Sequence, residues 1–205
     1  MTAAVLVIAK APVAGRVKTR LCPPCTPAEA AELAAAALQD TLEAAGAAGA
    51  GRRVLVLDGA PGPWLPAGWE VVPQRGDGLA ERLAAAFEDA GAPAFLVGMD
   101  TPQLTPALVR AGLDALTTHD ATLGPAADGG YWGIGLRRAD PAVFAGIPMS
   151  EPHTGAAQRH RLRALGLTTA ALPVLLDVDT IAAAHAVAAV APGSRFAARL
   201  AELAA

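Results

Sequence analysis

The chain has 205 residues, of which 53% are apolar and 17% charged, and its net charge is −3. This composition is typical of a globular protein, and the length fits a single domain, residues 1–205. The mild negative charge argues against a nucleic-acid partner, and no apolar run is long enough to cross a bilayer. Two cysteines, Cys22 and Cys25, provide no disulfide framework, so we expect a cytoplasmic protein without a membrane partner. The oligomeric state is left open.

Strand-like runs rich in Val, Leu and Ile alternate with alanine-rich helical stretches along the whole chain. In chain order they predict a strand at 3–8, a helix at 27–45, strands at 52–59 and 69–74, a helix at 77–91, a strand at 94–100, a helix at 106–119, two strands within 120–138, a helix near 154–165, a strand near 168–175 and an alanine-rich C-terminal segment. Thr26 and Glu29 form the pattern of a capping box at the start of the first helix.

The order of these elements predicts an α/β fold. Strands separated by helices form a mostly parallel or mixed central sheet that is covered by helices on both faces, in three layers. The first run is continuously apolar, as expected for a strand that is buried on both faces. In open sheets of this kind, ligands bind at the carboxyl ends of the strands. We therefore expect the site in the loops that follow the strands, at 9–25, 58–66, 74–78, 98–103, 124–132 and 177–180.

The first of these loops is strongly cationic. The stretch "AKAPVAGRVKTRL", residues 9–21, contains Lys10, Arg16, Lys18 and Arg20 and no acid. Gly15 suits an irregular turn whose backbone N–H groups face an anion. Four clustered cations repel one another unless a polyanion joins them, and a phosphate chain fits that description. The alternative is a solvated basic loop whose cations pair with acids elsewhere on the surface.

Two common phosphate-binding motifs are missing. The P-loop requires Gly-Lys before Ser or Thr, and here Val17 precedes Lys18. The stretch "GGYWGIG" lacks the later glycine and the helix start of a dinucleotide site, which argues against a hydride-transfer enzyme.

Asp100 ends the apolar run "AFLVGMD", so its carboxylate is expected at the same sheet edge as the cationic loop. A divalent cation that bridges phosphate oxygens to Asp100 would suit this arrangement, and hard oxygen ligands favour Mg²⁺ or Mn²⁺. The alternative is that Asp100 caps the following helix.

A second acidic signal is "LLDVDT", in which Asp177 and Asp179 flank Val178. Carboxylates two residues apart in an extended segment face the same side and repel each other, and a shared cation relieves that repulsion. Either residue could complete the metal site, and Asp179 could instead start the next helix.

The turn Asp128-Gly129-Gly130 joins the two strands within 120–138. Successive glycines permit a positive φ or close approach of the backbone to a ligand, although a plain hairpin turn uses the same residues. Tyr131 is the only tyrosine of the chain and adjoins this turn.

Taken together, "AKAPVAGRVKTRL", "GMDTPQL", "GPAADGGYWGIGL" and "LLDVDT" resemble a bacterial family of small GT-A-fold proteins from about residue 4 to residue 185. The family is labelled nucleotide-diphospho-sugar transferase-like or arsenosugar-biosynthesis-type glycosyltransferase, and it is similar to 2-phospho-lactate and molybdenum-cofactor guanylyltransferases. The resemblance implies a phosphate-binding loop at Lys10, Gly15, Lys18 and Arg20, to which the clustering of charge adds Arg16. It further implies metal ligands at Asp100 and Asp179, and an acceptor site at Asp128, Gly129 and Gly130, which Tyr131 adjoins. The segment "IPMSEPH" and the cysteines of "LCPPC" depart from the family's pattern.

Three functions follow from these residues. The first is metal-dependent transfer of a nucleotidyl group from a nucleoside triphosphate to a small phosphorylated or hydroxylated acceptor, with Lys18 and Asp100 as the catalytic residues. The second is glycosyl transfer from a nucleotide-diphospho-sugar to a small acceptor, with Mg²⁺ or Mn²⁺ stabilising the leaving diphosphate. The third is nucleotide binding without catalysis, which the altered "IPMSEPH" segment keeps open. Four cations favour a triphosphate over a diphosphate.

Overall fold

The computed structural model of the chain describes residues 3–91 and 93–203. Within these residues, seven strands form one sheet. The strands are β1 (Ala4–Lys10), β2 (Arg52–Asp58), β3 (Glu70–Pro73), β4 (Ala94–Gly98), β5 (Ala121–Pro125), β6 (Tyr131–Leu136) and β7 (Thr169–Ala171). The helices are α1 (Pro27–Gly46), α2 (Leu79–Ala90), α3 (Pro106–Ala115), α4 (Thr154–Ala164), α5 (Ile181–Val190), α6 (Arg195–Leu203) and the short 3-10 helices η1 (Thr19–Leu21) and η2 (Pro141–Val143).

The sheet is mixed and mostly parallel, with the order β3-β2-β1-β4-β6-β5-β7. β1 pairs in parallel with both β2 and β4, and β5 pairs in parallel with β7. β6 is antiparallel to β4 and β5, which flank it. The predicted α/β class is therefore confirmed.

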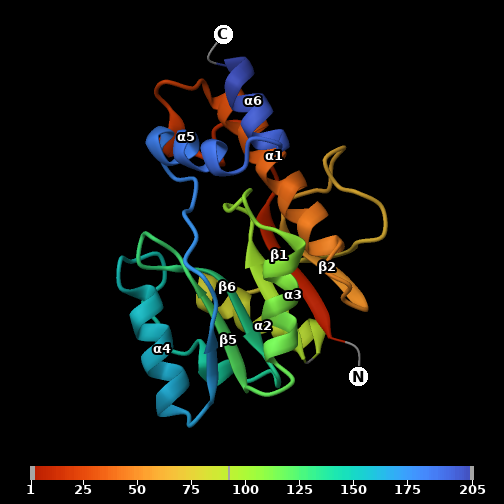
Figure 1. Ribbon diagram of the computed structural model, residues 1–205, viewed down its shortest axis with the longest axis vertical. Coiled ribbons are helices and arrows are strands. Elements are labelled where there is room, and N and C mark those ends of the chain that lie inside the picture. Colours follow the sequence, from red (N-terminus) through yellow and green to blue (C-terminus); the bar gives the residue numbers. More distant parts are fainter. Residues whose placement is uncertain (1–2, 92, 204–205) are drawn as a thin grey trace.

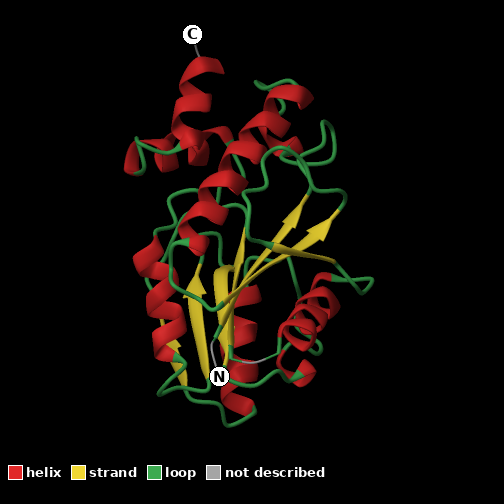
Figure 2. Cartoon of the chain, turned by 90° about the vertical axis from the view of Figure 1, so that its right-hand side faces the viewer, coloured by secondary structure: helices red, strands yellow, loops and turns green. Residues whose placement is uncertain are grey.

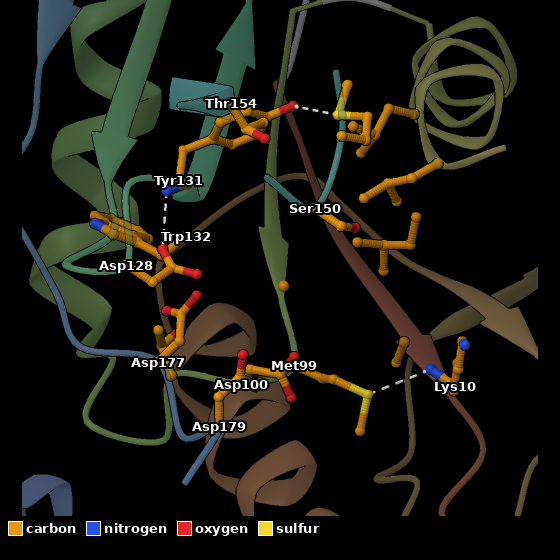
Figure 3. A pocket seen from close by; sticks show the side chains of 18 of the residues that line it. Lys10, Met99, Asp100, Asp128, Tyr131, Trp132, Ser150, Thr154, Asp177 and Asp179 are labelled. Carbon is orange, nitrogen blue, oxygen red and sulfur yellow. Dashed lines mark hydrogen bonds between the residues drawn. The ribbon is translucent and has the colours of Figure 1, made fainter. Parts of the chain in front are cut away.

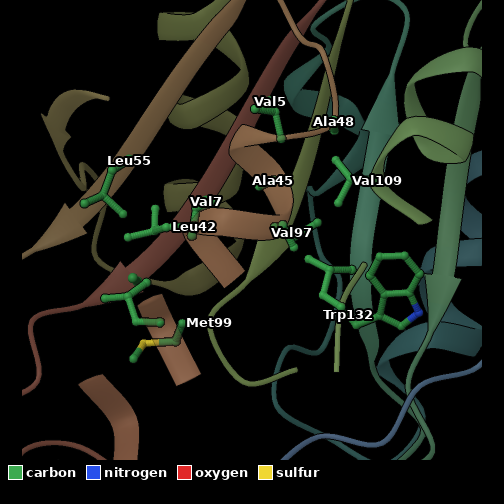
Figure 4. Packing of buried hydrophobic residues seen from close by; sticks show 14 of the residues in the cluster. Val5, Val7, Leu42, Ala45, Ala48, Leu55, Val97, Met99, Val109 and Trp132 are labelled. Atoms are coloured by element: carbon green, nitrogen blue, oxygen red, sulfur yellow. The ribbon is translucent and has the colours of Figure 1, made fainter. Parts of the chain in front are cut away.

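Helices cover both faces of the sheet, so the fold has three layers (Figure 2). Residues of α1 and α3 pack in the hydrophobic cluster on one face, and residues of α2, η2 and α4 pack in the cluster on the other. The sequence of β1 is continuously apolar because both of its faces are buried. Val5 and Val7 point into the first cluster, and Leu6 points into the second. Figure 4 shows Val5 and Val7 against Leu42 and Ala45 of α1. All four side chains are buried.

A third hydrophobic cluster lies beyond the carboxyl edge of the sheet, where α5 and α6 pack on the first half of α1 (Figure 1). Leu21 of η1 and Val178, just before α5, are fully buried in this cluster. It therefore fixes two segments that are far apart in sequence at the same edge of the sheet. The capping box predicted at Thr26 and Glu29 is present at the start of α1. None of the helices in the described residues is long and apolar enough to span a membrane.

Several predicted elements are shorter in the structure. The strand expected at 168–175 ends at Ala171, and Pro173 has no N–H with which to continue the ladder. The strand expected at 94–100 ends at Gly98, which is the last residue to pair with β1, and its pairing with β6 ends one residue earlier, at Val97. The helix expected at 106–119 ends at Ala115, where the hydroxyls of Thr117 and Thr118 bond to nearby backbone carbonyls.

Candidate functional site

A cavity of about 1030 Å³ opens at the carboxyl edge of the sheet. β1 and β4 are parallel neighbours, so the loops that follow them leave the sheet on this side. The predicted site residues that line the cavity are Lys10, Arg16, Lys18, Arg20, Asp100, Asp128, Gly130, Tyr131 and Asp179. Two predicted residues, Gly15 and Gly129, do not line it in the part of the chain that the structure describes.

The loop after β1 is held by two apolar anchors on either side of Lys18. Val17 is buried in the cluster beneath α1, and Leu21 is buried in the cluster beneath α5 and α6. Gly15 has a φ of +75°, and Lys18 itself is left-handed, with a φ of +49°. A positive φ is uncommon for a residue with a side chain and often occurs at functional sites. The loop turns the Lys18 side chain inward, where it is only 7% exposed, whereas the Arg20 side chain is 76% exposed.

The Lys18 ammonium lies between two carboxylates. Its Nζ is 2.6 Å from Oδ1 of Asp100 and 3.5 Å from Oδ1 of Asp179, and it donates a hydrogen bond to the backbone oxygen of Val178. Arg20 reaches the other oxygen of Asp179, at 3.1 Å. Both carboxylates remain open to the cavity, since the Asp100 side chain is 43% exposed and that of Asp179 is 40% exposed. One cation and two acids thus come together from three segments.

The cationic loop is therefore paired in part. Lys18 and Arg20 pair with acids that are distant in sequence, which agrees with one part of the alternative interpretation, a basic loop that pairs with acids elsewhere. These acids, however, line the cavity and do not lie on a separate part of the surface. Lys10 and Arg16 also line the cavity and form no ion pair within residues 3–91 and 93–203. Figure 3 shows Lys10 across the cavity from Asp100, Asp177 and Asp179.

Asp100 does not end a strand as expected, but lies in the turn two residues beyond β4. It does not cap the following helix either, because Thr105 is the N-cap of α3 and accepts a hydrogen bond from the N–H of Leu108. The backbone oxygen of Asp100 accepts a hydrogen bond from the N–H of Val178. This bond links the turn after β4 to the segment before α5, which carries the other carboxylates.

The segment that contains Asp177 and Asp179 lies beyond the end of β7 and is a tight turn, not the extended segment that the sequence predicted: the N–H of Asp179 donates to the carbonyl oxygen of Asp177 at 3.1 Å. Val178, between them, is buried in the cluster beneath α5, whereas Asp177 and Asp179 both line the cavity. Thr180, and not Asp179, caps α5 with its side chain. The Asp179 carboxylate is thus free of a capping role and bonds to Arg20.

Asp177 is the least compensated acid of the group. Burial raises the pKa of Asp177 to about 7, with further contributions from the charges of Asp128, Asp100 and Asp179, which Lys18 opposes. Its buried Oδ1 has no hydrogen-bond partner among the described residues. A partly buried, unpartnered carboxyl among three others indicates a place for a cation.

These carboxylates fit the chemistry of Mg²⁺ or Mn²⁺, which prefer hard oxygen ligands. An ion at this position would relieve the mutual repulsion of Asp100, Asp177 and Asp179. In the structure, however, no set of three or more His, Cys, Asp and Glu side chains in residues 3–91 and 93–203 converges to hold a metal. The Lys18 ammonium lies between Asp100 and Asp179 instead.

The Asp128-Gly129-Gly130 turn is a hairpin connection between β5 and β6. The Asp128 carboxylate accepts a hydrogen bond from the N–H of Gly130 at 2.8 Å. Gly129 has a φ of +93°, and a Cβ there would overlap the carbonyl oxygen of Pro152. Gly129 is therefore required because the backbone at Pro152, just before α4, packs closely against it, and not because a ligand does.

The Tyr131 hydroxyl points to α4, toward Oε1 of Gln158 at 3.4 Å and the sulfur of Met149 at 3.8 Å. Burial raises the pKa of the Tyr131 phenol, so this hydroxyl is a neutral donor.

The sequence pattern did not single out Arg82, which also lines the cavity. Arg82 bonds to Oε1 of Gln74 and to the backbone oxygen of Gly76, both at 3.2 Å. Arg82 lies on α2, outside the loops that follow strands, so the rule about strand ends did not indicate it. Its partners Gln74 and Gly76 lie in the loop at 74–78, which that rule did indicate.

The fold and this cavity define a class: the chain has the architecture of nucleotide-sugar transferases and nucleotidyltransferases. Over residues 28–151 it matches the family described as "Uncharacterized protein conserved in bacteria" (DUF2064), and it belongs to this family. The matched range includes Asp100 and Asp128 but neither the cationic loop nor Asp179. No curated protein matches the chain.

Three solved structures illustrate the class. A protein from Desulfovibrio desulfuricans G20, provisionally named a nucleotide-diphospho-sugar transferase, is 31% identical with a TM-score of 0.80, over 88% of this chain and 84% of that one. CMP:2-keto-3-deoxy-manno-octonic acid synthetase, solved with CTP, is 16% identical with a TM-score of 0.62, over 94% and 99%. Rv0371c from Mycobacterium tuberculosis H37Rv, solved with manganese, is 23% identical with a TM-score of 0.55, over 91% and 98%. The latter two support the fold alone.

Proposed function

We propose that this chain is a metal-dependent nucleotidyltransferase that moves a nucleotidyl group from a nucleoside triphosphate to a small phosphorylated or hydroxylated acceptor. One observation carries the proposal: the four cations of one loop and a group of carboxylates line the same large cavity at the carboxyl edge of the sheet, and two of the cations, Lys18 and Arg20, pair with those carboxylates. Phosphoryl chemistry depends mainly on positioning and on neutralising charge, and this cavity offers both.

The phosphate-binding residues in this proposal are Lys10, Gly15, Arg16, Lys18 and Arg20. Lys10 and Arg16 line the cavity without an ion pair in the described part of the chain, so they are available to phosphate oxygens. Arginine offers forked donors to phosphate and lysine offers a point charge. Gly15, in its left-handed conformation, shapes the loop rather than contacting the cavity.

Asp100 and Asp179 would hold Mg²⁺ or Mn²⁺, with Asp177 beside them. The bound ion would neutralise charge on the phosphate oxygens. Two proteins that share only the fold with this chain were solved with ligands of these kinds, Rv0371c with manganese and CMP:2-keto-3-deoxy-manno-octonic acid synthetase with CTP.

In the reaction, an acceptor oxygen forms a bond to the α-phosphorus, and the bond from that phosphorus to the departing pyrophosphate breaks. Lys18 and Asp100 are the proposed catalytic residues, since they meet at the centre of the charged group. We assign the acceptor side to Asp128, Gly130 and Tyr131, which line the cavity, on a turn that Gly129 shapes without lining the cavity itself. Asp128 and Asp177 lie side by side on the wall of the cavity, which supports an acceptor site next to the proposed metal site (Figure 3).

Glycosyl transfer from a nucleotide-diphospho-sugar is the second candidate. The observation that favours it is the 31% identity to the Desulfovibrio protein, whose provisional name gives that activity. The same carboxylates and cations would then hold a diphosphate as the leaving group.

A thermal-shift panel tests the proposal. We expect GTP or CTP with Mg²⁺ to raise the melting temperature, because a ligand that binds only the folded state stabilises it. Stabilisation by UDP- or GDP-sugars alone would support the glycosyltransferase instead. Stabilisation by nucleotides without turnover on a broad panel of acceptors would contradict both and leave a nucleotide-binding protein.

A further inference from the structure

The Lys18 ammonium is surrounded by oxygens of its own chain. Its neighbours are a carboxylate oxygen of Asp100, a carboxylate oxygen of Asp179 and the carbonyl oxygen of Val178. With a side chain only 7% exposed, Lys18 is largely withdrawn from solvent. A lysine in this position cannot at the same time offer its charge fully to a phosphate chain in the cavity.

The position of Lys18 is built into the fold. Val17 and Leu21, on either side of Lys18 in the sequence, are buried in two different clusters and hold the loop in place. The backbone at Lys18 is left-handed, and its side chain lies between Asp100 and Asp179. The N–H of Val178 donates a hydrogen bond to the backbone oxygen of Asp100. This bond holds the two acidic segments together around the ammonium. The arrangement therefore depends on buried anchors and backbone bonds rather than on a chance contact of a mobile side chain.

The carboxylates that surround Lys18 are the ones to which we assign the divalent cation. A lysine ammonium and a divalent ion both seek anionic oxygens, and they repel each other when they share them. Asp100 and Asp179 are nonetheless reachable from the cavity, because each side chain is about two-fifths exposed. An ion that arrives from the cavity would find Lys18 already in place.

We propose that Lys18 is an internal counter-ion that competes with the divalent cation for Asp100 and Asp179. This inference rests on the proposed function for the identity of the metal ligands. Its consequence is coupled binding: phosphate that draws the ammonium into the cavity opens the carboxylates to the metal, and the metal in turn frees Lys18 for phosphate. Such coupling is reciprocal by linkage.

Mn²⁺ alone is the probe for the first test, with free Mn²⁺ measured by electron paramagnetic resonance. Lys18→Gln is expected to bind Mn²⁺ at least about tenfold more tightly than the unmodified chain, because a competing charge is gone. Lys10→Gln is the matched control, since it removes the same charge from the same loop but not from between the carboxylates. We expect it to change the affinity by less than about threefold. Adding Asp100→Asn to Lys18→Gln should abolish the gain.

A second measurement uses the unmodified chain and avoids any loss of folding in a variant. Lys10 and Lys18 are the only two lysines of the sequence, and cleavage after Arg16 separates them for mass spectrometry. Reductive methylation should modify Lys18 more slowly than Lys10, and saturating Mn²⁺ should speed the modification of Lys18 while leaving Lys10 nearly unchanged.

The inference is overturned if Lys18→Gln binds Mn²⁺ no better than Lys10→Gln does, if Mn²⁺ binds to none of the proteins, or if Mn²⁺ leaves the methylation of Lys18 unchanged. Neither measurement contains a nucleotide. A chain that fails them but is stabilised by nucleotides would lose this inference and keep its nucleotide-binding function.

Discussion

Two groups of charged side chains lie close to α1, and their comparison separates structure from function. In each group, four acids face two cations. The outer group joins α1 to α6 and comprises Glu32, Asp40, Glu43, Glu202, Arg195 and Arg199. The inner group lies in the cavity and comprises Asp100, Asp128, Asp177, Asp179, Lys18 and Arg20.

The two groups differ in burial. The side chains of Glu32, Glu43 and Glu202 are each more than half exposed, so water screens their surplus negative charge. In the inner group the ammonium of Lys18 is withdrawn from water, and a buried oxygen of Asp177 has no partner among the described residues. The same ratio of charges is therefore screened by water at the surface, whereas in the cavity it leaves a buried carboxyl oxygen without a partner, which supports the proposed metal site.

The largest expected effect is on turnover, and it comes from Asp100→Asn. This change removes one negative charge from the proposed metal site with little change of shape. We expect metal-dependent release of pyrophosphate from a nucleoside triphosphate, assayed with a panel of acceptors, to fall by about 100-fold. The control in the outer group is Glu202→Gln, which should retain full activity. Normal activity of Asp100→Asn with Mg²⁺ would show that the metal assignment is wrong.

The next effect is on stability. Lys18→Met leaves Asp100, Asp177 and Asp179 without their shared cation, and it should lower the free energy of unfolding by about 2 kcal/mol in urea at pH 7.5 without divalent ions. Removing one partner of a fully buried ion pair costs roughly 3–5 kcal/mol. The cost is smaller here because Asp100 and Asp179 are partly exposed. An unchanged free energy of unfolding would indicate that the ion pairs at Lys18 contribute nothing to the fold.

The third prediction concerns pH. Burial and neighbouring acids raise the pKa of Asp177 from 3.8 to about 7, so the folded chain holds this proton more tightly than the unfolded chain does. Asp177 therefore costs stability as the pH rises between these two values, and the full cost is present above about pH 7. The full shift is worth about 4 kcal/mol at pH 8, and water reduces this cost because the carboxyl is only partly buried. Asp177→Asn should therefore raise the free energy of unfolding by about 1–2 kcal/mol at pH 8 and hardly change it at pH 4, with divalent ions chelated. Equal effects at both pH values would rule out the raised pKa.

The smallest effect is expected in the outer group. Arg199→Gln removes the partner of Glu32 and Glu202, and its free energy of unfolding should change far less than that of Lys18→Met. Raising the salt concentration should reduce the difference further, because salt screens exposed pairs. A loss as large as that of Lys18→Met would remove the contrast between the two groups.

The sequence was sufficient to predict much of the fold and the edge of the sheet at which the cavity opens. The continuous apolar run of β1, the capping box of α1 and the alternation of strands with helices led to the correct class, because each reflects local chemistry. The edge of the sheet that carries the site followed from one rule about parallel strands. Asp100 was correctly placed near the carboxyl edge of the sheet, even though the strand before it ends at Gly98.

What the sequence could not predict depends on contacts across the chain. The pairing of Lys18 with Asp100 and Asp179 arises because Leu21 and Val178 share a hydrophobic cluster, and these residues are far apart in sequence. For the same reason the sequence left the choice between Asp177 and Asp179 open. Only the fold shows that Asp177 has a buried oxygen without a partner among the described residues, whereas Asp179 bonds to Arg20. The role of Gly129 likewise requires knowing that Pro152 packs against it.

Calorimetric titration of the chain with nucleoside triphosphates and nucleotide-diphospho-sugars, each with and without Mg²⁺ or Mn²⁺, tests the central claim most directly. The account predicts heat of binding for at least one nucleoside triphosphate, greater affinity with the divalent ion, and loss of that metal-dependent gain in Asp100→Asn. No heat from any of these ligands under any of these conditions would contradict it.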